Sequence, residues 1–183
     1  MEKTVLVPVA DGTEELEAVA IIDVLRRAGA RVTVASVSQN RKITASRGVV
    51  LVADTTLDTC TDQTFDLIAL PGGLPGAEHL RDSADLTRLL KHQHRENRLI
   101  GAICASPAVV LAFHGLLEGR SATCHPSCQD QLTPAAYVHA PVVTDGNCVT
   151  GRGPGAAVDF ALELVSRLYG PEKRDAVAGP MGI

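Results

Sequence analysis

The chain has 183 residues, 45% hydrophobic and 21% charged, which is long enough for one large domain and too apolar for an intrinsically disordered protein. Its 17 basic and 21 acidic residues give a net charge of −4 without a long run of one sign, and only 3% of residues are aromatic. This composition argues against binding to nucleic acid or anionic membranes and favours small molecules or proteins as partners. Without a membrane-length apolar run or a leader-type cleavage site, we expect a cytoplasmic protein.

The first part of the chain alternates apolar runs with helical patterns. The run TVLVPVA (residues 4–10) predicts a buried strand, followed by a turn and about fifteen residues of helical composition that end at Gly29. Asp11 and Glu14 have the spacing of a capping box for this helix. Residues 31–37 then predict a second strand. Residues 43–46 and 48–54 could form a small antiparallel pair.

The rest of the chain continues this alternation. Strands are predicted at residues 65–73 and 99–104, at 121–124, and near 142–143 and 147–150; helices are predicted over 84–97, 107–114, 155–168 and 172–177. We expect residues 1–183 to form a single α/β domain, a flavodoxin-like three-layer α/β/α sandwich with a mostly parallel central sheet. Binding and catalytic sites in such folds lie at the carboxyl ends of the strands.

Cys104 follows the apolar strand of residues 99–103 and precedes Pro107, which suits the first turn of a helix that Ser106 could cap. A thiol at a helix N-terminus is expected to have a lowered pKa and to act as a nucleophile. The chain has five cysteines, an odd number, which favours free thiols in a reducing compartment. From its position alone, however, Cys104 could equally be a buried structural residue.

Two glycines, Gly72 and Gly73, follow the strand that ends near residue 70. Without side chains, their backbone N–H groups could approach a ligand and, with the N–H of Ala105, form an oxyanion hole. A simple tight turn explains the same residues, and the fragment is too short for a dinucleotide-binding motif.

Three carboxylates lie at the start of the first predicted helix. Helical periodicity places Glu14 and Glu17 on stripes with apolar residues, so either could point inward, and it does not separate them. The residues that share a helix face with Glu15 are more polar, so Glu15 is expected to be the exposed one of the three.

Cys124, His125 and Cys128 lie close together in the sequence. Their C-H-x-x-C spacing matches no paired zinc signature, so we expect no metal and interpret His125 as a partner of a thiol. The other histidines are expected on the surface or in loops.

The motifs together resemble a known family from end to end. The matching stretches are DGTEELEAV, RRAGARVTVAS, SRGV, LPGGLPGAEHLRDS, GAICASPAVVLA, TCHP and GRGPGAAVDFAL. They are similar to the ThiJ/PfpI superfamily, and most of all to its branch that contains the human parkinsonism-associated protein deglycase.

The resemblance implies a role for several residues. Cys104 matches the nucleophile, Glu17 the protonated carboxyl that hydrogen-bonds it, and His125 the neighbouring histidine; Gly73 and Ala105 match the backbone donors. The residues that match the pocket lining or the nearby homodimer contact are Glu14, Arg27, Arg47, Gly72 and Arg152.

The sequence departs from the family pattern at a few positions. Gly101 and Ser106 stand where the similar members usually carry Ala and Gly, which bears on the shape of the pocket. Val52 stands where the human relative has a second redox-active cysteine, so a role that needs that thiol is not expected.

The resemblance implies a homodimeric, cofactor-free enzyme of glyoxalase III or deglycase type, acting on methylglyoxal, glyoxal and their adducts in carbonyl and oxidative stress defence. An alternative is a redox-sensing or chaperone-like protein in which Cys104 is oxidised. Other branches of the superfamily are intracellular cysteine peptidases and hydratases, and Glu17 in the first helix favours the deglycase-like branch over them.

Overall fold

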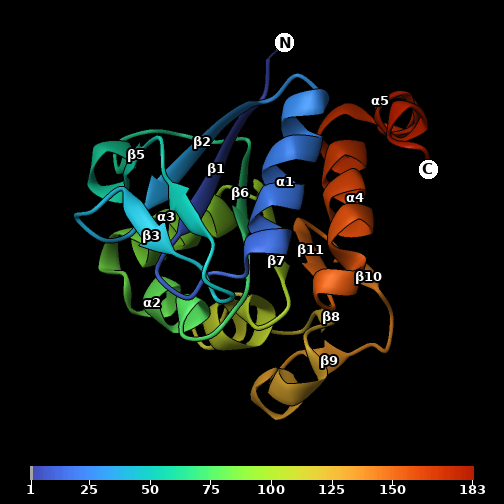
Figure 1. The fold of residues 1–183 in the computed structure, drawn as a ribbon. Coiled ribbons are helices and arrows are strands. Elements are labelled where there is room, and N and C mark those ends of the chain that lie inside the picture. Colours follow the sequence, from blue (N-terminus) through green and yellow to red (C-terminus); the bar gives the residue numbers. More distant parts are fainter. Residues whose placement is uncertain (1) are drawn as a thin grey trace.

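The computed structural model describes residues 2–183 and has a seven-stranded sheet at its centre (Figure 1). In spatial order the strands are β10 (Val142–Asp145), β11 (Cys148–Gly151), β7 (Leu99–Ile103), β6 (Leu67–Leu70), β1 (Thr4–Val9), β2 (Arg31–Ser36) and β5 (Thr55–Thr56). Neighbouring strands are parallel except for β10 and β11. Because the chain starts at β1 and winds outward in both directions, this is a doubly wound sheet. The predicted α/β fold with a mostly parallel sheet is confirmed.

Helices cover both faces of the sheet. On one face α1 (Glu15–Arg27) packs beside α4 (Ala157–Tyr169), against which α5 (Pro171–Ala178) rests (Figure 1). On the other face lie α2 (Gly76–Asp82), α3 (Ala84–Arg95) and the helical segment Pro107–Ala112. Two separate clusters of buried aliphatic residues, one on each face, fill the space between helices and sheet. Burial of these side chains is the main force that holds the three layers together.

Four short strands lie outside the central sheet. The predicted antiparallel pair is present as β3 (Lys42–Thr44) and β4 (Val50–Val52), while β8 (Ser121–Ala122) pairs in parallel with β9 (Ala136–Tyr137). Short 3₁₀ turns cover Leu57–Cys60, Pro126–Gln131, Pro154–Ala156 and Gly179–Met181. The sequence pattern did not predict α2, β5 or β9, which are seven residues or fewer.

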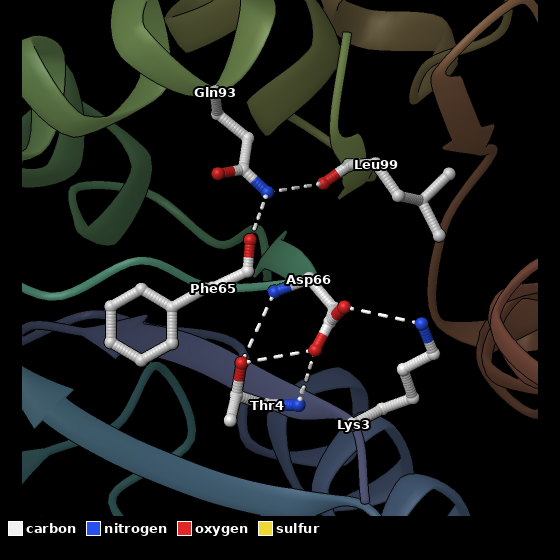
Figure 2. A network of polar contacts seen from close by, with 6 residues as sticks. All are labelled: Lys3, Thr4, Phe65, Asp66, Gln93 and Leu99. Carbon is white, nitrogen blue, oxygen red and sulfur yellow. Dashed lines mark hydrogen bonds and ion pairs between the residues drawn. The ribbon is translucent and has the colours of Figure 1, made fainter. Parts of the chain in front are cut away.

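A network of polar contacts fixes the amino ends of the central strands (Figure 2). The side-chain amide of Gln93 on α3 donates to the carbonyl oxygens of Phe65 (3.0 Å) and Leu99 (3.1 Å), which lie at the starts of β6 and β7. The Asp66 carboxylate accepts hydrogen bonds from the backbone N–H of Thr4 (2.8 Å) and from Lys3 (3.2 Å). These contacts hold the strands in register at the end of the sheet opposite to the one where Cys104 lies.

The start of α1 differs from the predicted capping box. Glu14 is the N-cap residue, and its carboxylate accepts the Glu17 N–H at 2.8 Å. Asp11 instead accepts the backbone N–H of Thr44, on the β3–β4 hairpin, at 2.7 Å. The predicted stop is confirmed, because α1 ends two residues before Gly29, whose φ of 85° lies in the left-handed region.

All five cysteines are buried free thiols, in agreement with the expectation from their number. None of the helices within residues 2–183 combines the length and the hydropathy needed to span a bilayer.

Candidate active site

The candidate site lies where the carboxyl ends of β6 and β7 meet the start of α1. The turn after β6 supplies Gly72 and Gly73, the turn after β7 supplies Cys104, and α1 supplies Glu17. Of these, Gly73 and Cys104 border a pocket of about 290 Å³, whereas Gly72 and Glu17 are buried and do not line it. The pocket is lined by Glu14, Ser46, Arg47, Gly73, Leu74, Cys104, Ala105, His125, Ser127, Cys128 and Pro154. The topology thus brings together residues that lie far apart in the sequence, at the position expected for a doubly wound sheet.

Cys104 occupies a sharp turn between β7 and the following helical segment. Its φ of 66° lies in the left-handed region, which side chains other than glycine seldom adopt. Its backbone is held on both sides, since its N–H donates to the carbonyl of Gly151 (2.9 Å) and its carbonyl accepts the N–H of His125 (2.8 Å). The side chain reaches the pocket although the residue is only 8% exposed. Such a turn resembles the strained elbow that presents the nucleophile in other α/β enzymes.

Gly72 allows the close approach of the nucleophile and the carboxyl. A Cβ atom at this position would lie 2.6 Å from the Cβ of Cys104 and 2.9 Å from Glu17 Oε2. Any side chain here would therefore push the two groups apart. This requirement for glycine is steric and is separate from the simple tight turn considered from the sequence.

Glu17 is the carboxylate of α1 that points into the core. It is fully buried, and its Oε2 accepts the Gly72 N–H at 2.8 Å, whereas Oε1 has no hydrogen-bond partner among the described residues. Burial raises the pKa of Glu17 to about 7; contacts with Gly72 and Cys104 oppose this rise, and the charge of Glu14 adds to it. A large fraction of Glu17 is therefore protonated near neutral pH.

The Cys104 thiol differs from the expectation of a lowered pKa. Burial raises the pKa of Cys104, and a negative charge on Glu17 raises it further, while the backbone N–H groups of Gly73 and Ala105 act in the opposite direction. The helix N-terminus alone therefore does not make this cysteine a thiolate. When Glu17 carries a proton, however, its repulsion is absent, so the titrations of the two groups are coupled.

Ser106 does not cap the helical segment that follows it, contrary to the sequence-based prediction. Its side chain is fully buried, and its hydroxyl donates to the carbonyl oxygen of Pro71 at 2.6 Å. The helical segment has no side-chain cap, and Pro107 stands at its first position, where the missing N–H costs nothing. Ser106 thus connects the turn of Cys104 to the turn after β6.

The structure separates the three glutamates of α1. Glu14 caps the helix and lines the pocket, and Glu17 points inward. The prediction of an exposed Glu15 is wrong, because Glu15 is only 9% exposed and accepts hydrogen bonds from Ser46 Oγ (2.9 Å) and the Arg47 N–H (2.8 Å). Burial alone would raise the pKa of Glu15, but these hydrogen bonds and others from the backbone lower it. Helical periodicity could not reveal a loop that lies thirty residues further along the chain.

His125 lines the pocket and also caps the 3₁₀ turn that begins at Pro126. Its Nδ1 accepts the backbone N–H of Ser127 (3.3 Å) and lies 2.8 Å from the Ser127 hydroxyl. In a neutral imidazole the hydrogen therefore belongs to Nε2, which becomes a donor. Sequence reasoning missed Ser127, which no motif marks, and considered Cys128 only as a zinc ligand and not as a pocket residue.

The three arginines that match the family pattern lie in different places. Arg47 lines the pocket, next to the Glu15 contact. Arg152 lines an adjoining hollow of about 390 Å³, which also contains His125, and its guanidinium lies 3.3 Å from His139 Nε2. Arg27 pairs with Asp23 (2.7 Å) at the far end of α1, about 20 Å along the helix from the pocket, so it does not line the pocket of its own chain.

Within residues 2–183, no three histidine, cysteine or acidic side chains gather in an arrangement that could hold a metal ion. The pKa of Cys124 is raised to about 11, mainly by burial and further by the nearby Cys128. Both are inner residues of the fold, with exposed fractions of 0% and 3%.

Comparison with known proteins agrees with this geometry. The family model described as "DJ-1/PfpI family" matches residues 3–167. The chain belongs to the DJ-1/PfpI family. Within it, the chain is similar to the DJ-1 homologs B and A of Arabidopsis thaliana, with 51% and 50% identity over 92% and 96% of this chain. It spans 39% and 45% of the length of those two proteins.

Other family members match over nearly their whole length. The glutathione-independent glyoxalase DJR-1.2 of Caenorhabditis elegans is 38% identical, over 97% of this chain and 94% of that protein. The structure of oxidized Toxoplasma gondii DJ-1 superposes with a TM-score of 0.96 at 47% identity, covering 98% of this chain and 97% of that one. The resemblance seen in the sequence motifs is therefore confirmed, together with the fold.

Proposed function

We propose that this DJ-1 family protein is a cofactor-free glyoxalase of the glutathione-independent type, which converts methylglyoxal and glyoxal, free or as adducts on thiols and amines, to hydroxy acids. The observation that carries the proposal is the buried Glu17 carboxyl, whose pKa is about 7, next to the Cys104 thiol at the floor of a small pocket. A carboxyl that gains and loses a proton near neutral pH is suited to general acid–base chemistry. The physiological role that fits this activity is defence against carbonyl and oxidative stress.

The first step is addition to the aldehyde. With Glu17 protonated and Cys104 as the thiolate, the sulfur forms a bond to the aldehyde carbon of methylglyoxal, and the carbonyl π electrons move to its oxygen. The backbone N–H groups of Gly73 and Ala105 are the donors available to that oxygen. Glu17 gives its proton to this oxygen, which yields a hemithioacetal and leaves Glu17 as a carboxylate, while the Nε2–H of His125 can assist by donating a hydrogen bond.

The second step moves hydrogen between the two carbons. The Glu17 carboxylate removes the proton from the carbon bound to sulfur, and an enediol forms; reprotonation of the neighbouring carbon then gives a thioester. Water hydrolyses the thioester to lactate and regenerates the thiol. The sum is methylglyoxal plus water to lactate, in which one carbon is oxidised and its neighbour reduced, so the reaction needs no external oxidant or reductant.

The relatives support this class of reaction, since a protein 38% identical over nearly its whole length is named a glutathione-independent glyoxalase. A second candidate is a redox sensor in which a peroxide oxidises Cys104. It is favoured by the solved oxidized state of Toxoplasma gondii DJ-1 and by backbone donors that could hold oxygen atoms on the sulfur. Both candidates use the same residues.

Steady-state kinetics with methylglyoxal, without glutathione, distinguish the two. We expect saturable lactate formation by the unmodified protein and none by the Cys104→Ser variant. Glu17→Gln and Glu17→Leu should both reduce kcat at least about 100-fold, the range typical of a lost general acid–base group, because neither side chain carries a transferable proton. Negligible turnover by the unmodified protein would favour the sensor. Near-native turnover of Glu17→Gln would mean that His125 or water, and not Glu17, moves the proton.

A further inference from the structure

Ser106 begins a continuous chain of hydrogen bonds that ends at the Glu17 carboxyl. Its hydroxyl donates to the carbonyl oxygen of Pro71 at 2.6 Å. That carbonyl and the N–H of Gly72 belong to the same peptide group, and the Gly72 N–H donates to Glu17 Oε2 at 2.8 Å. All of these groups are buried, so water does not compete for them.

A peptide group that accepts a hydrogen bond at its oxygen becomes a stronger donor at its nitrogen, because the amide is polarised along its length. The Ser106 hydroxyl therefore strengthens the bond from Gly72 to Glu17. It also limits rotation of this peptide, whose neighbour in the chain carries the Gly73 N–H that acts on Cys104. The next carbonyl, that of Gly72, is held in turn by the N–H of Glu14 at 2.9 Å.

We propose that Ser106 is a positioning residue, whose hydroxyl fixes and polarises the Pro71–Gly72 peptide so that the Gly72 N–H holds the Glu17 carboxyl beside Cys104. The catalytic consequence rests on the proposed function, but the hydrogen-bond relay itself does not. Ser106 touches neither the pocket nor Cys104's reacting atom, so it acts through Glu17.

The relay predicts a direction for the titration of Glu17. Loss of the hydroxyl weakens the hydrogen bond from Gly72 to the charged carboxylate. The protonated form of Glu17 is then favoured relative to the carboxylate, so the pKa of Glu17 rises. The other titratable groups that act on this carboxyl are Glu14, at the N-cap of α1, and Cys104, after β7. Neither changes when Ser106 is replaced.

The test follows the carboxyl carbon of Glu17 by NMR of protein labelled with ¹³C in its glutamate carboxyl groups, with the signal assigned by its loss in Glu17→Gln. The titration of Glu17 is measured both in the unmodified protein and in the Cys104→Ser background, so that the pKa of the carboxyl can be separated from the effect of the coupled thiol. We expect Ser106→Ala and Ser106→Gly each to raise the pKa of Glu17 by roughly 0.5, given the modest strengthening expected of each bond in such a chain. Ser106→Thr, which retains the hydroxyl, should leave it within about 0.2 of the unmodified protein.

The matched control is Thr123→Val. Thr123 is fully buried and its hydroxyl donates to the carbonyl of Ala140 at 3.0 Å, away from Glu17. This variant loses the same kind of bond and should not move the titration of Glu17. An unchanged titration in both Ser106→Ala and Ser106→Gly would overturn the proposal, and so would an equal shift in Thr123→Val. Failure of the proposed enzyme function would appear separately, as absent methylglyoxal turnover in the unmodified protein.

Discussion

At the scale of single residues, the titrations of Glu17 and Cys104 depend on each other. Burial disfavours charge on both groups; a charged Glu17 disfavours charge on Cys104, whereas the hydrogen bond from the Cys104 thiol favours the Glu17 carboxylate. The backbone donors act on different members of the pair: Gly72 on the carboxylate, and Gly73 and Ala105 on the sulfur. A change in one of these donors therefore shifts the pKa of the group to which it donates. This explains why replacing either member should alter the titration of the other.

The raised pKa of Glu17 predicts a pH dependence of stability. Between pH 4.5 and about 7 the folded chain binds a proton at Glu17 that the unfolded chain releases, so the contribution of this residue to stability is lost as pH rises through that window. Glu17→Gln, which carries no charge, should not show this loss. We expect the free energy of unfolding of Glu17→Gln, relative to the unmodified protein, to increase by about 3 kcal/mol between those pH values. Urea unfolding of both proteins across this range measures it, and a difference independent of pH would contradict the buried, protonated state.

At the scale of elements, the packing of α4 on β7 depends on Gly101. A Cβ atom at this position would lie 2.9 Å from a Leu164 methyl carbon and 3.1 Å from the ring of Phe160, and both side chains are fully buried. Gly101→Ala should therefore lower the free energy of unfolding by about 1 to 2 kcal/mol through overpacking. Gly155→Ala is the control, because its Cβ would meet no atom within 4 Å, and it should stay within about 0.5 kcal/mol. Equal effects of the two substitutions in urea unfolding would refute the packing argument.

The elements also show what could be predicted from the sequence. All strands except the two-residue β5 and β9, the long helices and the turn at Cys104 follow from local patterns, namely apolar runs and proline or glycine at element ends, so they were predictable. The N-cap of α1 and the burial of Glu15 were not, because both depend on the β3–β4 hairpin and its loop, which contact α1 only in the folded state. Periodicity likewise left Glu14 and Glu17 equivalent, and only the position of Gly72 decides which of them reaches Cys104. The Ser106 bond to Pro71 joins two turns and has no local signal.

At the scale of the whole molecule, one exposed apolar area remains to be explained. Leu16 and Val19 share a face of α1 and are 53% and 49% exposed, while Val49, Val50 and Val52, in and beside β4, are 46% to 66% exposed. Glu15 on α1 contacts the loop before β4, so the two groups of exposed side chains lie on neighbouring elements. We propose that a second copy of the chain covers this area in a homodimer, with Arg27 near its border.

This proposal predicts the mass in solution. Sedimentation equilibrium at micromolar concentration should give a dimer for the unmodified protein and a monomer for Val19→Lys, because a buried lysine charge in an apolar contact is strongly unfavourable. Phe113→Lys is the control: Phe113 is 66% exposed but follows the helical segment on the opposite face of the sheet, so this variant should remain dimeric. A monomer mass for the unmodified protein would exclude the homodimer.

The left-handed backbone at Cys104 has a consequence for the evolution of the chain. Only Asn97 and Cys104, among the described residues other than glycine, have positive φ values, and a side chain in this conformation costs roughly 1 kcal/mol that glycine would avoid. Selection for stability alone would therefore replace the cysteine by glycine. Under the proposed function, selection for the reactivity of the thiol outweighs that cost. In a lineage that lost the activity, position 104 should be among the first to drift toward glycine.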